Sequence, residues 1–412
     1  LHLRKAIVLG GTNDHITLIE KLKKREYFVI LIDYLTNPPA KDYSDKFIQE
    51  STLDLNKVVL IAQKEKVDLI IATCIDQALV TMAHVSEMLN LPCHLSYQDA
   101  LNLTDKSNMK RILRDGKIPT SNFIIIDENL NLDEINLEFP LVIKPTDSNS
   151  SKGVLKASTY EELSSAMNEA LKVSRSKKII IEEYKDGTEL SADVIIQNGV
   201  ADVIMITENI KSLDANHFTI VQSFFDISVH QTYYEKIKTI AQKIAQIFNL
   251  KNTPLLIQLI LKKDEIFIIE FSARIGGGSK IHFIKKITEF DILDFFIDSI
   301  LGNLSKITPK YLTKYGILNY VYATNGVLET VEGLTNLENN GIIDSYYLYK
   351  SKNSVVSDFK ASSDRILGFL ILTDDKSSLL TKIPQAEKAI KVLNDNNGDI
   401  TLRGLYRESN DR

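Results

Sequence analysis

The sequence has little cysteine, since Cys74 and Cys93 are the only two among 412 residues. Without a C-x-x-C pair, neither a thiolate zinc site nor a disulfide scaffold is expected. No apolar run approaches the roughly 20 residues that span a bilayer. The apolar run at 6–9 is too short for the core of a signal peptide. We therefore expect a reduced, cytoplasmic protein with no membrane partner.

An excess of positive charge is also missing. Lys and Arg number 49 and Asp and Glu number 54, for a net charge of −5. That balance argues against a nucleic-acid partner, whereas a small anionic ligand needs only local positive charge. At about 150 residues per domain, the length suggests two to three domains. The 44% hydrophobic content is that of a globular chain.

Common catalytic patterns are absent as well. The seven histidines are scattered, and no Cys–His or Ser–His–Asp arrangement is visible. The dinucleotide fingerprint G-x-G-x-x-G is missing, although Gly10-Gly11 follows a strand at 6–9 and Asp33 lies about 20 residues on, as a ribose-binding acid would. We interpret this turn as a tight strand-to-helix connection. An NAD site and another anion at the helix N-terminus are the alternatives.

Alternating strand and helix patterns in the first hundred residues predict a parallel sheet with helices on its faces. A helix is expected over 105–114, where Lys106 and Lys110 share one face. Taken alone, that pair predicts only a solvated lysine face. The middle of the chain is strand-rich, and Asn198-Gly199 predicts a two-residue hairpin turn. Later helices are expected over 234–248 and near 385–393.

A buried strand at 141–144 ends on Lys144 and continues into a small polar loop. Such a loop offers backbone N–H groups and hydroxyls to phosphate oxygens, and the lysine adds a point charge. An exposed serine-rich turn is the alternative. The loop residues in question are Ser148, Ser150, Ser151, Lys152 and Gly153.

The segment 179–189 breaks at Gly187 between two strands. A strand edge of this kind can pair its backbone with an adenine rim, and Glu189 would then accept hydrogen bonds from ribose hydroxyls. A plain strand connection with surface acids is the alternative.

Polar residues interrupt two apolar strands at 254–260 and 266–272. A turn centred on Asp264 opposes Gln258 to Glu270 and places Ser272 on the same face. A turn at Asp264-Glu265 would instead oppose Leu259 to Glu270. Hard oxygen ligands beside phosphates are what Mg²⁺ requires, so the first register predicts a metal site. A solvated polar pair is the alternative.

The second of these strands continues into Arg274 and three glycines, Gly276, Gly277 and Gly278. A guanidinium is a bidentate partner for a carboxylate or a phosphoryl group. Glycines would let a substrate approach the backbone closely. The alternative is that Arg274 pairs with an acidic neighbour and the glycines only make a tight bend. His282, shortly after, is a further candidate for substrate contact.

Together, the lysine-ended strand, the small loop, the Glu182-Glu183-Tyr184 hinge and the E-x-S-x-R-x-G-G-G strand resemble the ATP-grasp superfamily of carboxylate–amine ligases. Gln258 resembles the residue at this position in the carbamoyl phosphate synthase large subunit. The triple glycine resembles L-amino-acid ligases. Ser272 departs from the usual Asn, which affects the ligand set of a second metal. Arg274 matches the arginine that contacts the transferring phosphate and the substrate carboxylate.

The resemblance implies the following site residues. ATP would be bound by Lys106, Lys144, Ser148, Ser150, Ser151, Lys152, Gly153, Glu182, Glu183, Tyr184, Lys185 and Glu189. Mg²⁺ or Mn²⁺ would be bound by Gln258, Glu270 and Ser272. Lys144 and Arg274 would be catalytic, and Arg274 with Gly276, Gly277 and Gly278 would bind substrate.

The implied fold is α/β and α+β, with a Rossmann-like domain at 1–104 and an ATP-grasp domain at 105–305. The latter divides into a small lid subdomain at 105–185 and a catalytic subdomain at 186–305, and an α+β region at 306–412 completes the fold. The implied reaction joins a carboxylate to an amine through an acylphosphate, with an amino acid as the expected substrate. A bicarbonate-using carboxyphosphate enzyme and a non-catalytic nucleotide-binding protein are the alternatives, and a homodimer remains open.

Overall fold

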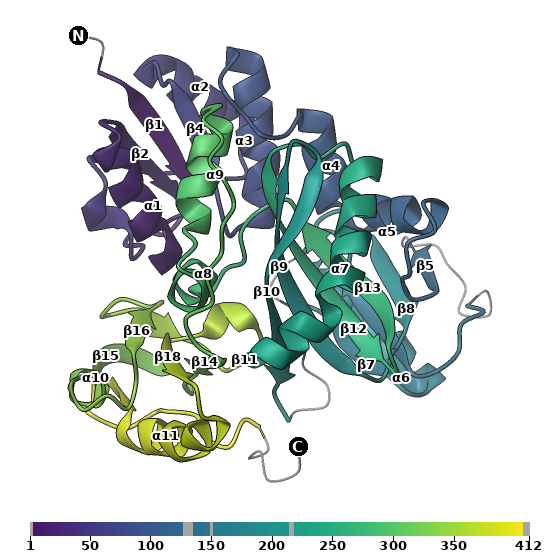
Figure 1. The fold of residues 1–412 in the computed structure, drawn as a ribbon, viewed down its shortest axis with the longest axis vertical. Coiled ribbons are helices and arrows are strands. Elements are labelled where there is room, and N and C mark those ends of the chain that lie inside the picture. The colour runs from purple at the N-terminus through teal and green to yellow at the C-terminus, as the bar shows by residue number, and fades with distance from the viewer. Residues whose placement is uncertain (1–2, 127–134, 149–150, 214–217, 407–412) are drawn as a thin grey trace.

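The computed structural model describes residues 3–126, 135–148, 151–213 and 218–406. Ser150, one of the expected loop residues, lies outside the described residues. Figure 1 shows the N-terminal unit at the upper left, a small sheet around β8 at the lower right, and the C-terminal part at the lower left.

The N-terminal unit is a four-stranded parallel sheet in the order β3-β2-β1-β4. This confirms the expected alternation of strands and helices. Its strands are β1 (Lys5–Leu9), β2 (Phe28–Asp33), β3 (Lys46–Gln49) and β4 (Leu69–Ala72), and the helices are α1 (Asn13–Lys24), α2 (Leu55–Glu65), α3 (Asp76–Leu89), α4 (Tyr97–Thr104) and α5 (Lys106–Asp115).

The Gly10-Gly11 turn after β1 is occupied by contacts with Asp33 and Pro38. The Gly11 N–H donates to Asp33 Oδ2 at 2.7 Å, and a Cβ placed on Gly11 would lie 2.6 Å from Pro38 Cβ. Asp33 also accepts a hydrogen bond from the Leu35 N–H at 2.8 Å. The acid is therefore engaged in holding the turn, which supports the interpretation as a tight connection.

The small sheet is antiparallel, in the order β5-β8-β6-β7. Its strands are β5 (Phe123–Ile126), β6 (Leu141–Pro145), β7 (Leu155–Ala157) and β8 (Ile179–Glu183), and helix α6 (Tyr160–Val173) joins β7 to β8. Apolar residues of α6 and of the strands form a separate small core.

The large sheet is antiparallel and eight-stranded, in the order β13-β12-β9-β10-β11-β14-β18-β16. It runs across the predicted boundary at residue 305, because β14, β18 and β16 follow that position. The strands are β9 (Thr188–Gln197), β10 (Val200–Lys211), β11 (Ile220–Asp226), β12 (Thr253–Lys262), β13 (Glu265–Ser272), β14 (Tyr315–Val321), β16 (Ser345–Leu348) and β18 (Leu367–Thr373), with helices α7 (Ile227–Ile247), α8 (Lys280–Thr288) and α9 (Ile292–Ile300).

The C-terminal part adds a three-stranded sheet in the order β17-β15-β19. The helix expected near 385–393 is wrong in its bounds, since α11 begins at Lys376 and ends at Ala389 and β19 follows at once. Apolar periodicity alone did not separate the end of the helix from the buried strand. The remaining elements are β15 (Gly326–Glu332), β17 (Val355–Val356), β19 (Lys391–Asn394) and α10 (Leu334–Asn339).

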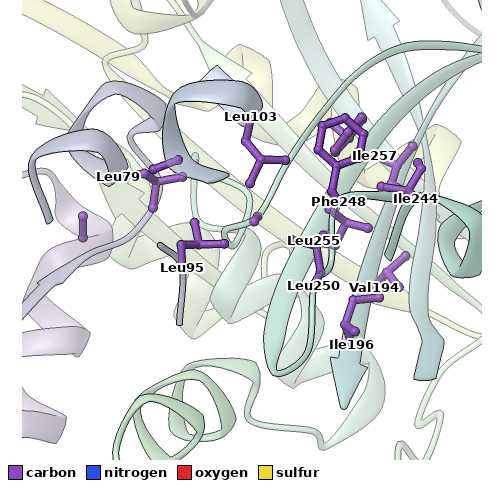
Figure 2. Packing of buried hydrophobic residues seen from close by; sticks show 14 of the residues in the cluster. Leu79, Leu95, Leu103, Val194, Ile196, Ile244, Phe248, Leu250, Leu255 and Ile257 are labelled. Carbon is purple, nitrogen blue, oxygen red and sulfur yellow. The ribbon is translucent and has the colours of Figure 1, made fainter. Parts of the chain in front are cut away.

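One apolar core joins the N-terminal unit to the large sheet. Figure 2 shows Leu79, Leu95 and Leu103 of the N-terminal unit in the same cluster as side chains of β9, α7 and β12. Such a shared core favours a fixed relation between the two parts. None of the described helices combines the length and hydrophobicity needed to cross a membrane.

Candidate active site

The β12–β13 hairpin carries the polar residues that the sequence singled out. Gln258 pairs with Glu270 across the ladder, and Leu256 pairs with Ser272. Residues 255, 257 and 259 are buried, whereas 256, 258 and 260 are half-buried. This alternation places Gln258 on the face opposite the apolar core. The predicted register is therefore confirmed at the site.

The turn that produces this register differs from the predicted one. Lys262 pairs with Glu265, so Lys263 and Asp264 form a two-residue turn with φ of 46° and 67°. Left-handed backbone at both central residues is typical of a type I′ hairpin. A β-bulge between Gln258 and Leu259 then shifts the register and restores the Gln258–Glu270 pair.

A pocket lies between this hairpin and the N-terminal unit. Its lining combines hairpin residues with the start of α3, the α4–α5 segment and the loop after β6. The lining residues are Asp76, Gln77, Leu103, Thr104, Lys106, Met109, Ser148, Leu256, Gln258, Glu270, Phe271, Ser272 and Arg274. Of the residues expected to bind nucleotide, metal or substrate, the pocket brings together Lys106, Ser148, Gln258, Glu270, Ser272 and Arg274, whereas Lys144 and the three glycines are not among its lining residues.

Lys106, the first residue of α5, joins two walls of this pocket. Its Nζ lies 2.8 Å from Glu270 Oε2 and donates to the Ser148 carbonyl at 3.0 Å. Burial alone would raise the pKa of Glu270, but the ammonium groups of Lys106 and Lys144 together hold that pKa below its ordinary value. The site therefore presents an ionised carboxylate beside a lysine.

Lys144 forms an ion pair with the buried carboxylate of Glu182. Glu182 lies between two ammonium groups, with Oε1 3.1 Å from Lys144 Nζ and Oε2 2.8 Å from Lys110 Nζ. Burial would raise the pKa of Glu182, yet the two lysines lower it overall. Glu182, which the resemblance places in the nucleotide site, is thus paired with two lysines in this structure.

Lys110 overturns the interpretation of the α5 lysines as a solvated face. Its side chain is 2% exposed, and Nζ also donates to Thr120 Oγ1 at 2.6 Å and to the Ile268 carbonyl at 3.1 Å. Lys110 therefore ties the small sheet to the bulge of β13. The helical spacing identified the shared face of Lys106 and Lys110 but not its burial.

Arg274 forms a bidentate ion pair with Asp76. Its Nε and Nη2 each lie 2.7 Å from an Asp76 carboxylate oxygen, and Nη1 donates to the Ile275 carbonyl at 2.8 Å. The Arg274 guanidinium and Asp76 both line the pocket. The acidic neighbour considered from the sequence is therefore present, and it comes from the N-terminal unit.

The triple glycine turn packs against the N-terminal unit. The N–H groups of Gly278 and Ser279 donate to the two Asp14 oxygens at 3.0 and 2.9 Å. A Cβ on Gly277 would meet only ordinary contacts with Cys74, the nearest at 3.5 Å. Gly277 therefore has room for a side chain, the Gly278 N–H is already bonded, and neither glycine is among the residues that line the pocket.

The hinge residues make separate contacts. Glu183 accepts from Asn122 Nδ2 at 3.1 Å and from Lys185 Nζ at 3.0 Å. The Tyr184 ring lies under Lys156 Nζ, 3.9 Å from its centroid. Glu189, on β9, accepts from Asn209 Nδ2 at 3.0 Å and pairs with Lys211. These residues lie at the end of β8, in the connection to β9 and at the start of β9.

The loop after β6 is described only in part. Ser148 Oγ donates to the Lys152 carbonyl at 2.8 Å, and Ser151 Oγ donates to the Phe218 carbonyl at 3.2 Å. Gly153 has a φ of +71°, which favours glycine. His282 stacks on Tyr347 with ring centroids 4.5 Å apart and is not among the residues that line the pocket.

Sequence reasoning missed Asp76 as a pocket residue. Asp76 follows β4 at the carboxyl edge of a parallel sheet, where ligand-binding residues of open α/β folds gather. That position was the available signal. Its partner Arg274 could not be inferred, because 198 residues separate the two.

The donor set suits a divalent cation held together with phosphates. Among the described residues, no three His, Cys, Asp or Glu side chains gather as a metal site by themselves. Glu270 supplies one carboxylate and Gln258, opposite it, one amide oxygen. Mg²⁺ is commonly held by one or two carboxylates plus substrate phosphates. Gln258 and Glu270 therefore fit such an ion.

Known proteins share both sequence and architecture with this chain. Residues 137–282 match the ATP-grasp domain family. The carbamoyl phosphate synthase large chain of Pseudothermotoga lettingae is 23% identical over 79% of this chain and 31% of that protein. The D-alanine–D-alanine ligase of Flavobacterium psychrophilum is 27% identical over 51% of this chain and 67% of that protein. The chain thus spans less than a third of the length of the synthase.

The structure of an L-amino acid ligase from Bacillus licheniformis superposes with a TM-score of 0.79 at 17% identity, covering 95% of this chain and 99% of that one. At this identity the likeness shows the fold, here an ATP-grasp fold preceded by a Rossmann-like unit. Together with the domain match, it confirms the resemblance inferred from the motifs. Residues 137–282 thus match an ATP-grasp domain, and the likeness in fold extends over nearly all of the chain.

Proposed function

We propose that this protein is an ATP-dependent carboxylate–amine ligase that forms an amide or peptide bond through an acylphosphate and releases ADP and phosphate. One observation carries the proposal: Lys106, Glu270 and Arg274 line a single pocket together with Gln258. We further propose that the units 1–104, 105–305 and 306–412 act as the Rossmann-like, ATP-grasp and closing regions.

The chemistry requires few acids or bases. A carboxylate oxygen attacks the γ-phosphorus of ATP, and the bond to ADP breaks. The amine nitrogen then attacks the acyl carbon, phosphate leaves, and the nitrogen loses a proton. Positioning and charge neutralisation dominate such reactions. Lysines and an arginine near a carboxylate are suited to both tasks.

In this proposal Lys106 and Lys144 neutralise phosphate oxygens, and Arg274 orients the reacting carboxylate. Gln258 and Glu270, with Ser272 beside them, hold Mg²⁺ or Mn²⁺. When bound, the cation offsets the charge of the phosphoryl oxygens. Lys106 and Lys144 now contact Glu270 and Glu182, so bound nucleotide would share these lysines with the carboxylates.

The hinge and the loop supply the remaining nucleotide contacts in this proposal. The backbone of Glu182, Glu183, Tyr184 and Lys185 would meet the adenine, and Glu189 the ribose. Ser148, Ser151, Lys152 and Gly153 would approach the phosphates. The substrates are small molecules, a carboxylate and an amine.

The test is phosphate release from ATP and Mg²⁺ over pairs of amino acids, with each substrate omitted in turn. A carboxylate substrate labelled with heavy oxygen should pass label to the released phosphate, because its oxygen attacks phosphorus. Release that depends on bicarbonate instead would favour the carboxyphosphate reaction. ATP binding without release across the whole panel would favour a non-catalytic protein.

A further inference from the structure

Arg365 is a cation that contacts aromatic side chains. It precedes β18 and is half-buried. Its guanidinium carbon lies 3.5 Å from the centroid of the Tyr320 ring, and Nε donates to Tyr322 Oη at 3.2 Å. Among the described residues no Asp or Glu forms an ion pair with it, whereas Arg274 has Asp76. A half-buried guanidinium held by aromatic rings retains the capacity to bind an anion.

The position of Arg365 links it to the proposed site. A Cβ placed on Gly278 would collide with Arg365 Nη1, so the guanidinium lies against the last glycine of the triple glycine turn. Tyr320 Oη also donates to the Gly278 carbonyl at 3.0 Å. Arg274 precedes the same turn by two residues. The turn therefore lies between one paired and one unpaired arginine.

The same turn also contacts a carboxylate, that of Asp14 on α1. Asp14 accepts from the N–H groups of Gly278 and Ser279, and it forms no ion pair among the described residues. The Arg365 charge acts on Asp14, opposing part of the effect of burial on that carboxyl. A cation and an anion therefore face one turn without pairing with each other. An α-amino acid carries the complementary pair of charges.

Arg365 is not among the residues that line the pocket of Lys106, Glu270 and Arg274. The carboxylate that attacks phosphorus belongs in that pocket, so an anion on Arg365 is a different, non-reacting carboxylate. We propose that Arg365 binds the carboxylate of an α-amino acid that supplies the amine. The amine substrate is then an amino acid rather than ammonia or a simple amine. This inference rests on the proposed ligase function.

The experiment measures binding to the full chain by calorimetry with Mg²⁺ and a non-hydrolysable ATP analogue. The probes are the common L-amino acids and their α-carboxamides, which keep the amine and lose the carboxylate. For the amino acids that bind, the wild type should prefer the acid by at least about 30-fold, since a buried charge pair is lost in the amide. Arg365→Gln should weaken binding of the amino acid by a similar factor and abolish the preference for the acid over the carboxamide.

Two further variants make the result specific. Arg365→Lys keeps the charge and loses the fork, so its preference should fall between those of the wild type and Arg365→Gln. Lys360→Gln removes an exposed positive charge nearby in the chain and should leave the preference unchanged. The melting temperature of each variant shows whether it is folded, and Arg365→Lys decides the matter if Arg365→Gln is not.

An acid preference that survives in Arg365→Gln, equal binding of acids and amides by the wild type, or no binding of any amino acid would overturn the inference. Its failure is distinguishable from failure of the ligase proposal. Phosphate release with simple amines, unchanged in Arg365→Gln, would refute the role of Arg365 and keep the ligase. Amino-acid binding that depends on Arg365, without phosphate release, would refute the ligase proposal and keep the role of Arg365 in binding.

Discussion

Arg274 and Asp76 make a two-pronged ion pair between the large sheet and the N-terminal unit, with both N–O distances at 2.7 Å. The pair pre-orients the guanidinium inside the pocket. In the proposed function Asp76 is a positioning residue for Arg274, and a substrate carboxylate would approach the edge formed by Nη1 and Nη2, because Asp76 occupies the edge formed by Nε and Nη2.

Arg274→Lys should lower kcat/KM for the carboxylate substrate at least 10-fold while the ATP dissociation constant changes little. Lysine keeps the charge but cannot form the fork with Asp76. Steady-state kinetics and nucleotide titration check this. Joint loss of ATP affinity and melting temperature, with no selective effect on the carboxylate substrate, would make Arg274 structural.

Glu270→Ala should abolish turnover that depends on Mg²⁺, because Glu270 is the only carboxylate in the expected ligand set. Glu265→Ala, at the exposed first residue of β13, is the matched control and should be near wild type. Ser272→Asn should be tolerated and raise or preserve activity. Phosphate release titrated with Mg²⁺ measures all three, and full activity of Glu270→Ala would refute the metal assignment.

Lys144→Ala should weaken ATP binding and cut turnover by about 100-fold or more, since it removes a charge directed at phosphate. It also leaves Glu182 with Lys110 as its remaining lysine partner. Lys172→Ala, at an exposed position of α6, serves as control. Wild-type kinetics in Lys144→Ala would place the nucleotide elsewhere.

Asp14 should make stability fall as pH rises. Burial raises its pKa to about 6, while the backbone N–H bonds from Ser279 and Gly278 counteract only part of this. Between pH 4 and 6 the folded state thus binds more protons than the unfolded state. The contribution is complete below about pH 4 and is lost as pH rises through 6, on the order of 3 kcal/mol.

Urea unfolding at pH 4 and pH 7 tests this with Asp14→Asn, which cannot titrate. The unfolding free energy of the wild type, relative to that of the variant, should be lower at pH 7 than at pH 4. A difference that stays constant with pH would show that Asp14 keeps its ordinary pKa.

Much of the fold was predictable because the local patterns are strong. The parallel N-terminal sheet followed from alternating strands and helices, and Asn198-Gly199 does connect β9 to β10. The predicted pairing of Gln258 with Glu270 is confirmed, although the predicted turn is wrong. Polar residues in two apolar strands indicate which residues share the polar face, and this does not depend on the type of turn. The bulge that reconciles the two leaves no signal in the apolar sequence around it.

The rest depends on contacts between distant segments. Lys110 appeared to be a surface lysine because its partners, Glu182 and the Ile268 carbonyl, lie 72 and 158 residues away. Arg365 carries no local motif, and only the folded chain brings it against the glycine turn. The spacing of residues along the sequence predicts which side chains share one face of a helix or strand. The partners of those side chains in other segments become known only from the folded structure.

The bulge also limits how this hairpin can change in length. Side chains alternate between faces, so adding one residue between Glu270 and the turn would rotate Glu270 and Ser272 into the apolar core, whereas losing one residue would remove the bulge and keep Glu270 opposite Gln258. Leu259 pairs with Ile268 on one side of the shift and Gln258 with Glu270 on the other, which makes Ile269 the extra residue. Deletion of Ile269 would thus preserve the face that carries Gln258, Glu270 and Ser272, whereas a single insertion in this stretch would disable the site while leaving the strands intact.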